Sequence, residues 1–505
     1  MHDLGDRMGE VLTTTKPDAD ELAAAGHARD RACNAPLQVG VGIKGGAEIA
    51  IATVRVALQR RPDWAVLSDD KTNGFNSISR ESIFRGLRRW FPELIPTARL
   101  FYARQAALLY VGRDGRQLAT DERDAAFYSA EGCTQGDSLG PFLFAIGYHS
   151  ALLEAQAAHP DSTIIAYLDD TYHLDVPAAA LACMRTAETC SLDLCTIASN
   201  RTKQEAFTEA GDLSMLPSTI RGAPSAPPCP GKGYAGGALP CIKVLGSYIG
   251  DTAACSARLV ERVETHLRPL EDACRLRDTR RVNVSMQVQM EITRFCANTQ
   301  LNYFIRAMPL EATHTARRVH DHLIERAFHR VVGTGLGTAG ERARALTQAR
   351  LPVKLGGLGL TSQEAIAPAA VVGTWALCWG QMQRLCPQLC ADIDITTSQL
   401  PAFVELRAVH RELMAQHRIV QGIYDLWDAQ IYDIDREGES HTRYHPAGLT
   451  PAKRLLPLAE FGSKSEFLQH AQRLYSFCTA VYRILQYSCT LYCTHAHTQY
   501  IQYTK

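Results

Sequence analysis

The stretch Ile164-Ile165-Ala166-Tyr167-Leu168-Asp169-Asp170, followed by Thr171-Tyr172-His173-Leu174, decides the fold. An apolar run, two adjacent acids and a second largely apolar run predict a strand, a tight turn and a returning strand, with the acids at the tip. Neighbouring carboxylates repel each other and are costly to hold without a cation nearby. The pair therefore fits either an ordinary solvated turn, in which Asp is common, or one half of a metal site for phosphoryl transfer.

A second short apolar strand also ends in acids. Residues 64–68 (Trp-Ala-Val-Leu-Ser) precede Asp69 and Asp70, and residues 73–76 (Asn-Gly-Phe-Asn) predict a turn after them. Adjacent strands of one sheet would bring Asp70 and Asp169 to the same edge. Two divalent cations about 3.5–4 Å apart need carboxylates from such a pair, and Mg²⁺ prefers hard oxygen ligands.

Two glycine-rich loops precede predicted helices. Residues 36–46 lead into a helix over 47–60, but the Gly-Lys-Ser/Thr order of a phosphate-binding P-loop is absent. We expect this loop to be a backbone turn that something must approach closely. Residues 132–138 form the second loop, which opens a long apolar helix from 139 to about 158.

The remaining pattern divides the chain into an α/β block and a helical half. Flanking Arg113-Asp114-Gly115, segments 108–111 and 117–120 predict a hairpin. Further helices are expected over 79–94 and 177–194, and strands at 205–207 and 242–249. From 253 onward the pattern is almost wholly helical, with arginine- and histidine-rich segments at 256–278, 283–307, 311–332 and 341–350. Residues 487–505 show no helical or strand period.

Composition limits the possible classes of protein. A length of 505 residues predicts more than one domain, and 46% hydrophobic with 21% charged residues is typical of a soluble globular chain. Lys plus Arg and Asp plus Glu both number 53, so nucleic-acid binding must rest on a local site rather than on net charge. The longest apolar stretch, about 365–379, contains Pro368 and reads as too short to span a bilayer, so no membrane partner is expected. The sixteen cysteines indicate reduced thiols in the cytosol or nucleus.

Five segments, in the same order and spacing, resemble the motifs of reverse transcriptases. The resemblance is to non-LTR retrotransposon enzymes of protists, of the trypanosomatid kind, and covers about residues 36–380. Residues 38–42 and 355–360 also have counterparts there. The five motif-like segments are 70–80, 135–141, 167–170, 200–203 and 244–250.

The resemblance implies an α+β fold. We expect a right-hand polymerase palm, an antiparallel sheet with helices on one face, with partial fingers, an all-helical thumb and a C-terminal helical region. The fingers segment with basic residues that family members carry upstream of Gln38 is not found, so a truncated N-terminus is also expected. The expected divisions are 1–62 (partial fingers), 63–250 (palm), 251–350 (thumb), 351–486 (C-terminal helices) and 487–505 (unstructured tail).

The resemblance also implies roles for individual residues. Asp70 is preferred to Asp69 because its spacing to Phe75 fits the family. Phe75 would lie under the incoming sugar and favour deoxynucleotides, or it is an ordinary core residue. Lys203 is a candidate proton donor to pyrophosphate, or a solvated surface charge. The full set is Asp70, Asp169 and Asp170 as catalytic and metal-binding carboxylates, Phe75, Gln135, Gly136 and Lys203 as substrate-binding residues, and Leu245 and Gly246 in the primer grip.

The implied activity is RNA-templated DNA synthesis by two-metal-ion phosphoryl transfer, in retrotransposition. Two Mg²⁺ ions, or Mn²⁺ as a substitute, an RNA template, a DNA primer or target and dNTPs would be needed, and the arginine-rich helices would follow the nucleic-acid backbone. The alternative is a catalytically inactive nucleic-acid-binding scaffold or a retrotransposon relic. An RNA-templated RNA polymerase is disfavoured by Phe75. The oligomeric state stays open, and the location is nuclear or cytoplasmic, nuclear on the resemblance alone.

Overall fold

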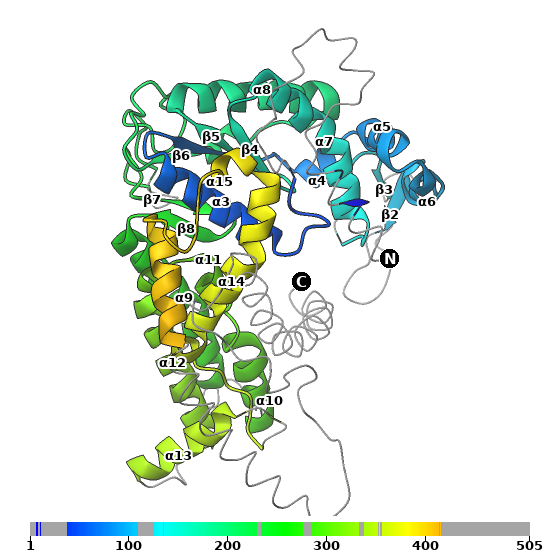
Figure 1. Cartoon of the computed structure of the whole chain (residues 1–505). Helices are drawn as coiled ribbons and strands as arrows, with labels where there is room; N and C mark the ends of the chain where they lie inside the picture. Colours follow the sequence, from blue (N-terminus) through cyan, green and yellow to red (C-terminus); the bar gives the residue numbers. More distant parts are fainter. Residues whose placement is uncertain are drawn as a thin grey trace, which may run out of the picture. The chain divides into compact units, whose positions relative to one another are not determined.

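The computed structural model describes residues 7, 8, 11, 38–109, 126–134, 136–229, 234–275, 285–332, 338–351, 353, 356–413 and 415. These residues belong to two compact units (Figure 1). The first holds the described residues up to 257 together with 378–392, and the second holds 258–377 and 393 onward. The five expected divisions stay predictions, and the expected tail over 487–505 lies outside the described residues.

A four-stranded antiparallel sheet, in the order β4-β5-β1-β6, is the centre of the first unit. Its strands are β4 (Thr163–Tyr167), β5 (Asp170–Asp175), β1 (Ala65–Asp69) and β6 (Glu205–Thr208). The expected strand, turn and returning strand are confirmed, because Tyr167 pairs with Asp170 and leaves Leu168 and Asp169 as a two-residue turn. The expected antiparallel sheet is confirmed as well, but helices pack on both of its faces rather than on one.

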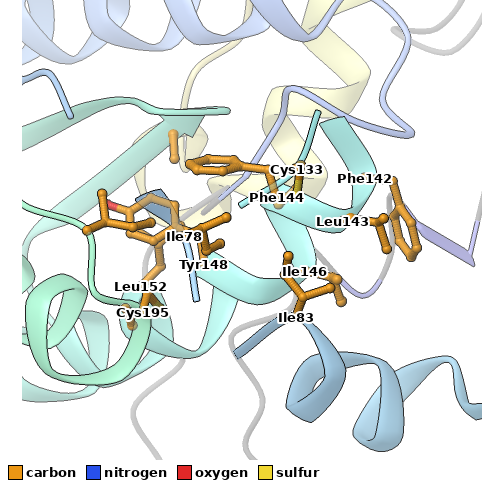
Figure 2. Packing of buried hydrophobic residues seen from close by; sticks show 14 of the residues in the cluster. Ile78, Ile83, Cys133, Phe142, Leu143, Phe144, Ile146, Tyr148, Leu152 and Cys195 are labelled. Carbon is orange, nitrogen blue, oxygen red and sulfur yellow. The ribbon is translucent and has the colours of Figure 1, made fainter. Parts of the chain in front are cut away.

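Helices α7 (Gly140–Ala158) and α8 (Pro177–Cys195) pack together and against the sheet, and α5 (Arg80–Trp90) packs on α7. Figure 2 shows the apolar core that they share, in which Phe144, Ile146 and Tyr148 of α7 are fully buried. Helix α3 (Gly46–Arg60) contacts β1 and β4 and lies on the other side of the sheet from α8 (Figure 1). Burial of each large side chain contributes roughly 1.5–3 kcal/mol, so this core is the main source of stability of the unit.

The first strand of the expected hairpin over 108–120 pairs with a later segment, and the expected second strand, 117–120, lies outside the described residues. Strand β2 (Ala106–Leu109) pairs with β3 (Ala126–Ser129), with Leu109 opposite Ala126. Phe127 and Tyr128 have the high strand propensity of aromatic residues, which favours a strand at 126–129. The other elements that precede β2 in this part of the chain are α4 (Gly74–Ser77), the 3-10 turn Pro92–Leu94 and α6 (Ile95–Tyr102).

The expected single strand over 242–249 is instead a hairpin. Strand β7 (Cys241–Val244) pairs with β8 (Ser247–Gly250), and Val244 lies opposite Ser247. Leu245 and Gly246 form the two-residue turn, with φ of 48° and 85°. Both angles are positive, as the twist of a two-residue hairpin requires, and a leucine is an unusual residue there.

The second unit is helical, as expected. Asp321 accepts hydrogen bonds from the backbone of Gln363 and Glu364 and from the Ser362 hydroxyl, so it caps the start of α14 (Gln363–Leu385). The second unit also contains α10 (Met286–Glu291), a π-helical turn (Ile292–Ala297), α11 (Phe304–Ala307), α12 (Leu310–Val332), α13 (Ala339–Arg350) and most of α9 (Thr252–Arg275). The start of α9, the end of α14 and the short α15 (Pro387–Cys390) belong to the first unit.

The apolar stretch around Pro368 is longer than the sequence indicated. Helix α14 has 23 residues, and Pro368 lies inside it without ending it. By length and composition this helix could cross a membrane, so the expectation that it is too short was wrong. Of its most apolar 18-residue window, however, 56% is buried within the protein, as in a core helix.

Candidate active site

Three carboxylates meet where β1 ends beside the β4–β5 turn. Asp69 is paired with Thr171, so Asp70, one residue further, lies next to Asp170 at the same end of the sheet. Asp169 occupies the second position of the turn between β4 and β5. A Cβ added at Gly74, in the loop after β1, would lie 3.3 Å from the Cβ of Asp169. The structure therefore brings Asp70, Asp169 and Asp170 together, as the two strand ends suggested.

Strand alternation separates the two neighbouring acids Asp69 and Asp70. Successive side chains of a strand point to opposite faces, so Asp69 shares a face with Thr171 and Asp70 shares the other face with Asp170. Thr171 lies within 3.3 Å of the Tyr148 hydroxyl on α7, which identifies the Asp69 face as the one covered by α7 and α8. Asp70 and Asp170 thus belong to the opposite face.

Asp69 is fully occupied by a buried network. Its Oδ2 accepts from Lys71 Nζ at 2.6 Å and from the Ser199 hydroxyl at 2.8 Å, and its Oδ1 accepts from Gln204 at 3.0 Å. Both side chains of the Asp69–Lys71 ion pair are 0% exposed. Although burial alone would raise the pKa of Asp69, Lys71 and the hydrogen bonds lower it. Asp69 is therefore a structural anion within the fold.

The other acids carry the electrostatic signs of a cation site. Burial raises the pKa of Asp169 more than a backbone hydrogen bond lowers it, and the charge of Asp70 raises it further against the smaller opposing effect of Lys203. Burial, then the charges of Asp169 and Asp70, raise the pKa of Asp170 to about 6, although Lys243 and Lys203 oppose this. Mutual repulsion of carboxylates at one place is how proteins prepare a site for a positive charge.

Lys203 supplies part of that positive charge. It lies in the short 3-10 turn Arg201–Lys203, and its Nζ is 2.6 Å from Asp70 Oδ2. The lysine side chain is 55% exposed and the Asp70 side chain 24% exposed. The hydrogen bond and charge of Asp70 raise the pKa of Lys203, so the ammonium group stays protonated at neutral pH. The structure thus places Lys203 beside Asp70, and its role toward pyrophosphate stays a prediction.

The donor set fits Mg²⁺, although the described residues contain no three Asp, Glu, His or Cys side chains already closed around a metal position. The fit rests on hard carboxylate oxygens, on their raised pKa values and on their shared sheet end. The Asp70 carboxylate forms an ion pair with Lys203, so a divalent ion bound to Asp70 would either displace Lys203 or bind the carboxylate together with it.

Phe75 lies beside these acids. It is half-buried on α4 and stacks on Phe144 of α7, with ring centroids 4.6 Å apart and planes inclined by 13°. Stacking on one face fixes the ring. This placement is compatible with both expectations for Phe75, the packed side chain and the surface under a sugar.

The second glycine-rich loop is fixed by residues that the sequence did not single out. The Tyr102 hydroxyl donates a short hydrogen bond to Asp137 and accepts from the Thr134 amide at 3.3 Å. Burial, then this bond to Asp137, raise the pKa of Tyr102 to about 12, so the hydroxyl remains a donor. The guanidinium of Arg80 donates to the carbonyls of Gly132 and Ser129, at 3.2 and 3.0 Å.

Gln135 lies outside the described residues, so its expected contact stays a prediction. Gly136 has a φ of 94°, and nothing lies within 4 Å of where its Cβ would be. The positive φ, rather than a close contact within the chain, is therefore what calls for glycine here.

The expected primer-grip residues lie in the β7–β8 turn and are tied to the palm. The Leu245 amide donates a hydrogen bond to the Tyr172 hydroxyl at 2.9 Å, and Tyr172 lies on the Asp70 face of β5. Lys243 of β7 is near enough to Asp170 to lower its pKa. The structure thus brings the turn with Leu245 and Gly246 to the face that carries Asp70 and Asp170.

Comparison with known proteins agrees with this geometry. Residues 37–212 match the family model described as reverse transcriptase (RNA-dependent DNA polymerase). The chain is 26% identical over 340 residues to the retrotransposable element SLACS 132 kDa protein of Trypanosoma brucei gambiense. That match covers 66% of this chain but only 25% of the relative, so the chain corresponds to about a quarter of the relative's length.

Among solved structures, the telomerase of Candida albicans with a fragment of telomeric RNA matches at 10% identity and a TM-score of 0.34, over 81% of this chain and 58% of that one. The apo telomerase of Candida tropicalis matches at 10% identity and a TM-score of 0.31, over 80% and 61%. Similarity at this level is too loose to support a conclusion. Residues 37–212 therefore resemble reverse transcriptases, and the chain is similar to a retrotransposon protein over two thirds of its length.

Proposed function

We propose that this chain is an RNA-templated DNA polymerase that adds dNTPs to the 3′-hydroxyl of a primer during retrotransposition. The observation that carries the proposal is the meeting of Asp70, Asp169 and Asp170 at one sheet end, inside the segment that matches the family. The partners would be an RNA template, a DNA primer or target, and dNTPs.

In this proposal Asp70 and Asp169 hold two Mg²⁺ ions and Asp170 supports them. When bound, such a pair of ions activates the attacking hydroxyl and stabilises the charge on the leaving pyrophosphate. Lys203 keeps its proton beside Asp70 and places a positive charge where the phosphates of a nucleotide would lie. The turn at Leu245 and Gly246, linked to Tyr172, would position the primer end on the same face.

The second unit would contribute contacts to nucleic-acid phosphates. Arg317 is buried near Glu364, so it belongs to the helical packing rather than to this surface. Other arginines of these helices are exposed and free to reach a phosphate backbone, as such contacts require. They include Arg258, Arg318, Arg344 and Arg350.

Primer extension tests the proposal. With an RNA template, a DNA primer, dNTPs and Mg²⁺ or Mn²⁺, we expect metal-dependent incorporation by the native chain and none by Asp169→Ala. Equal background in both proteins, together with retained binding of the primer–template, would leave the alternative of an inactive nucleic-acid-binding scaffold.

Phe75→Val is expected to increase the use of ribonucleotides relative to deoxyribonucleotides. The ring is held against Phe144, so it is a rigid obstacle to a 2′-hydroxyl, and the smaller side chain makes room for one. Single-nucleotide incorporation with dNTP and rNTP measures the ratio of the two kcat/KM values, and we expect it to shift by roughly 10–100-fold. An unchanged ratio would mean that Phe75 serves only the core.

Acidification is expected to weaken Mg²⁺ binding through Asp170. Its pKa is raised to about 6, so below that pH the carboxyl holds a proton that a metal must displace. The Mg²⁺ concentration for half-maximal extension should therefore rise as the pH falls through about 6. In the metal-free protein, acidification has the opposite effect on stability. Because folding raises the pKa of Asp170, protonation of this carboxyl increases the free energy of unfolding as the pH falls from about 6 toward the ordinary pKa of an aspartate. A Mg²⁺ requirement that is flat across this range would contradict the assignment.

A further inference from the structure

We propose that Gln38 is a positioning residue that holds the β4–β5 turn in the conformation that presents Asp169. The inference rests on the proposed function for its catalytic meaning, but the contact between Gln38 and the turn is independent of it.

The Gln38 side chain bonds both backbone groups of Leu168, the residue directly before Asp169. Its Oε1 accepts from the Leu168 amide at 2.7 Å, and its Nε2 donates to the Leu168 carbonyl at 3.1 Å. Leu168 has a φ of 56°, in the left-handed region that is unfavourable for a residue with a branched side chain. An amide side chain that satisfies both groups at once stabilises this conformation over the alternatives.

The backbone around Gln38 fixes that side chain. The Val39 amide donates to the Ala166 carbonyl at 2.8 Å, and Gln38 forms a parallel bridge with Ala166, so the segment lies along β4 near its end. Gln38 is 0% exposed, and its Oε1 also accepts from the Gly40 amide at 3.0 Å. The side chain therefore has one orientation, with its donor and its acceptor both directed to the turn.

Gly40 makes the close approach possible. A Cβ at this position would lie 2.8 Å from the Leu168 nitrogen and 2.9 Å from Gln38 Oε1. This is the close approach to the first glycine-rich loop that the sequence predicted, and the segment that approaches is the acid-bearing turn. The loop and the turn thus form one unit whose geometry fixes where the Asp169 carboxylate stands.

Gln38→Met tests the proposal, because methionine has a similar length and keeps the apolar contacts but forms neither hydrogen bond. Gln156→Met is the matched control. Gln156 is equally buried and donates to the carbonyls of His159 and Ser162, at the other end of β4. Gly40→Ala is a second variant that disturbs the contact without removing a polar group.

Two measurements are made on the full chain. Hydrogen exchange of peptides that span residues 164–174 should accelerate in Gln38→Met and Gly40→Ala but not in Gln156→Met. The Mg²⁺ concentration for half-maximal primer extension should rise by roughly 10–100-fold in the first two variants and stay native in the control, as for residues that orient metal ligands.

Unchanged exchange of the turn in Gln38→Met would overturn the proposal. So would a Mg²⁺ requirement that shifts equally in Gln38→Met and Gln156→Met, because that pattern indicates general destabilisation. If the native chain itself does not extend a primer, the proposed function fails, and hydrogen exchange still decides whether Gln38 holds the turn.

Discussion

Asp70→Asn is expected to lower the rate of primer extension by roughly 10³-fold or more, because loss of a metal-binding carboxylate removes several kcal/mol of transition-state stabilisation. The folded structure should change little. Asp70 is partly exposed, and its partner Lys203 is mostly exposed, so no buried charge is left behind. Single-turnover extension on an RNA template measures the rate, and circular dichroism with thermal unfolding checks the fold.

Asp175→Asn is the matched control for this substitution. Asp175 is the residue at the opposite end of β5, where it accepts from the Ser162 hydroxyl at 2.7 Å. We expect near-native extension from it. A native rate for Asp70→Asn, or an equal loss in both variants, would remove Asp70 from the site.

Lys71→Met is expected to reduce the free energy of unfolding by about 3–5 kcal/mol, since breaking a buried ion pair leaves an uncompensated charge. The Lys71 ammonium is fully buried, bonded to Asp69 at 2.6 Å and to the Ser199 hydroxyl at 3.1 Å. Although burial alone would lower the pKa of Lys71, Tyr148 and Asp69 raise it, so the charge is present at all physiological pH values. Urea denaturation gives the change in unfolding free energy.

The double variant Asp69→Leu/Lys71→Met removes both charges of the buried ion pair, whereas Lys71→Met removes only one of them. Replacing both charges with apolar groups leaves no orphan, so the double variant should be clearly more stable than Lys71→Met alone. Additive losses in the double variant would mean that the two residues act independently, which the 2.6 Å contact contradicts.

The sequence was sufficient for the features that depend on local pattern. The run from Ile164 to Leu174 predicted a strand, a turn and a strand because two largely apolar runs flank a pair of acids. The preference for Asp70 over Asp69 came from the family resemblance, through the spacing to Phe75, and stays a prediction. The structure adds a physical reason, since strand alternation places the two acids on opposite faces of β1.

Features that depend on distant pairs were not predictable in this way. Gln38 and Leu168 are 130 positions apart, and nothing in a glycine-rich loop shows which turn it will touch. The contact between Tyr102 and Asp137 and the buried Lys71 also depend on the assembled packing of α6, α7 and α8. The partner of β2 was not predicted for a related reason, because a local Asp-Gly turn signal does not specify the partner strand.

Direct measurement of Mn²⁺ binding tests the central claim that Asp70, Asp169 and Asp170 form a divalent metal site. Electron paramagnetic resonance counts the bound Mn²⁺ in the native chain with a primer–template that lacks a 3′-hydroxyl and the matching dNTP. We predict protein-dependent binding that Asp169→Asn abolishes and Asp175→Asn preserves. Equal Mn²⁺ binding by the native chain and Asp169→Asn would contradict the account.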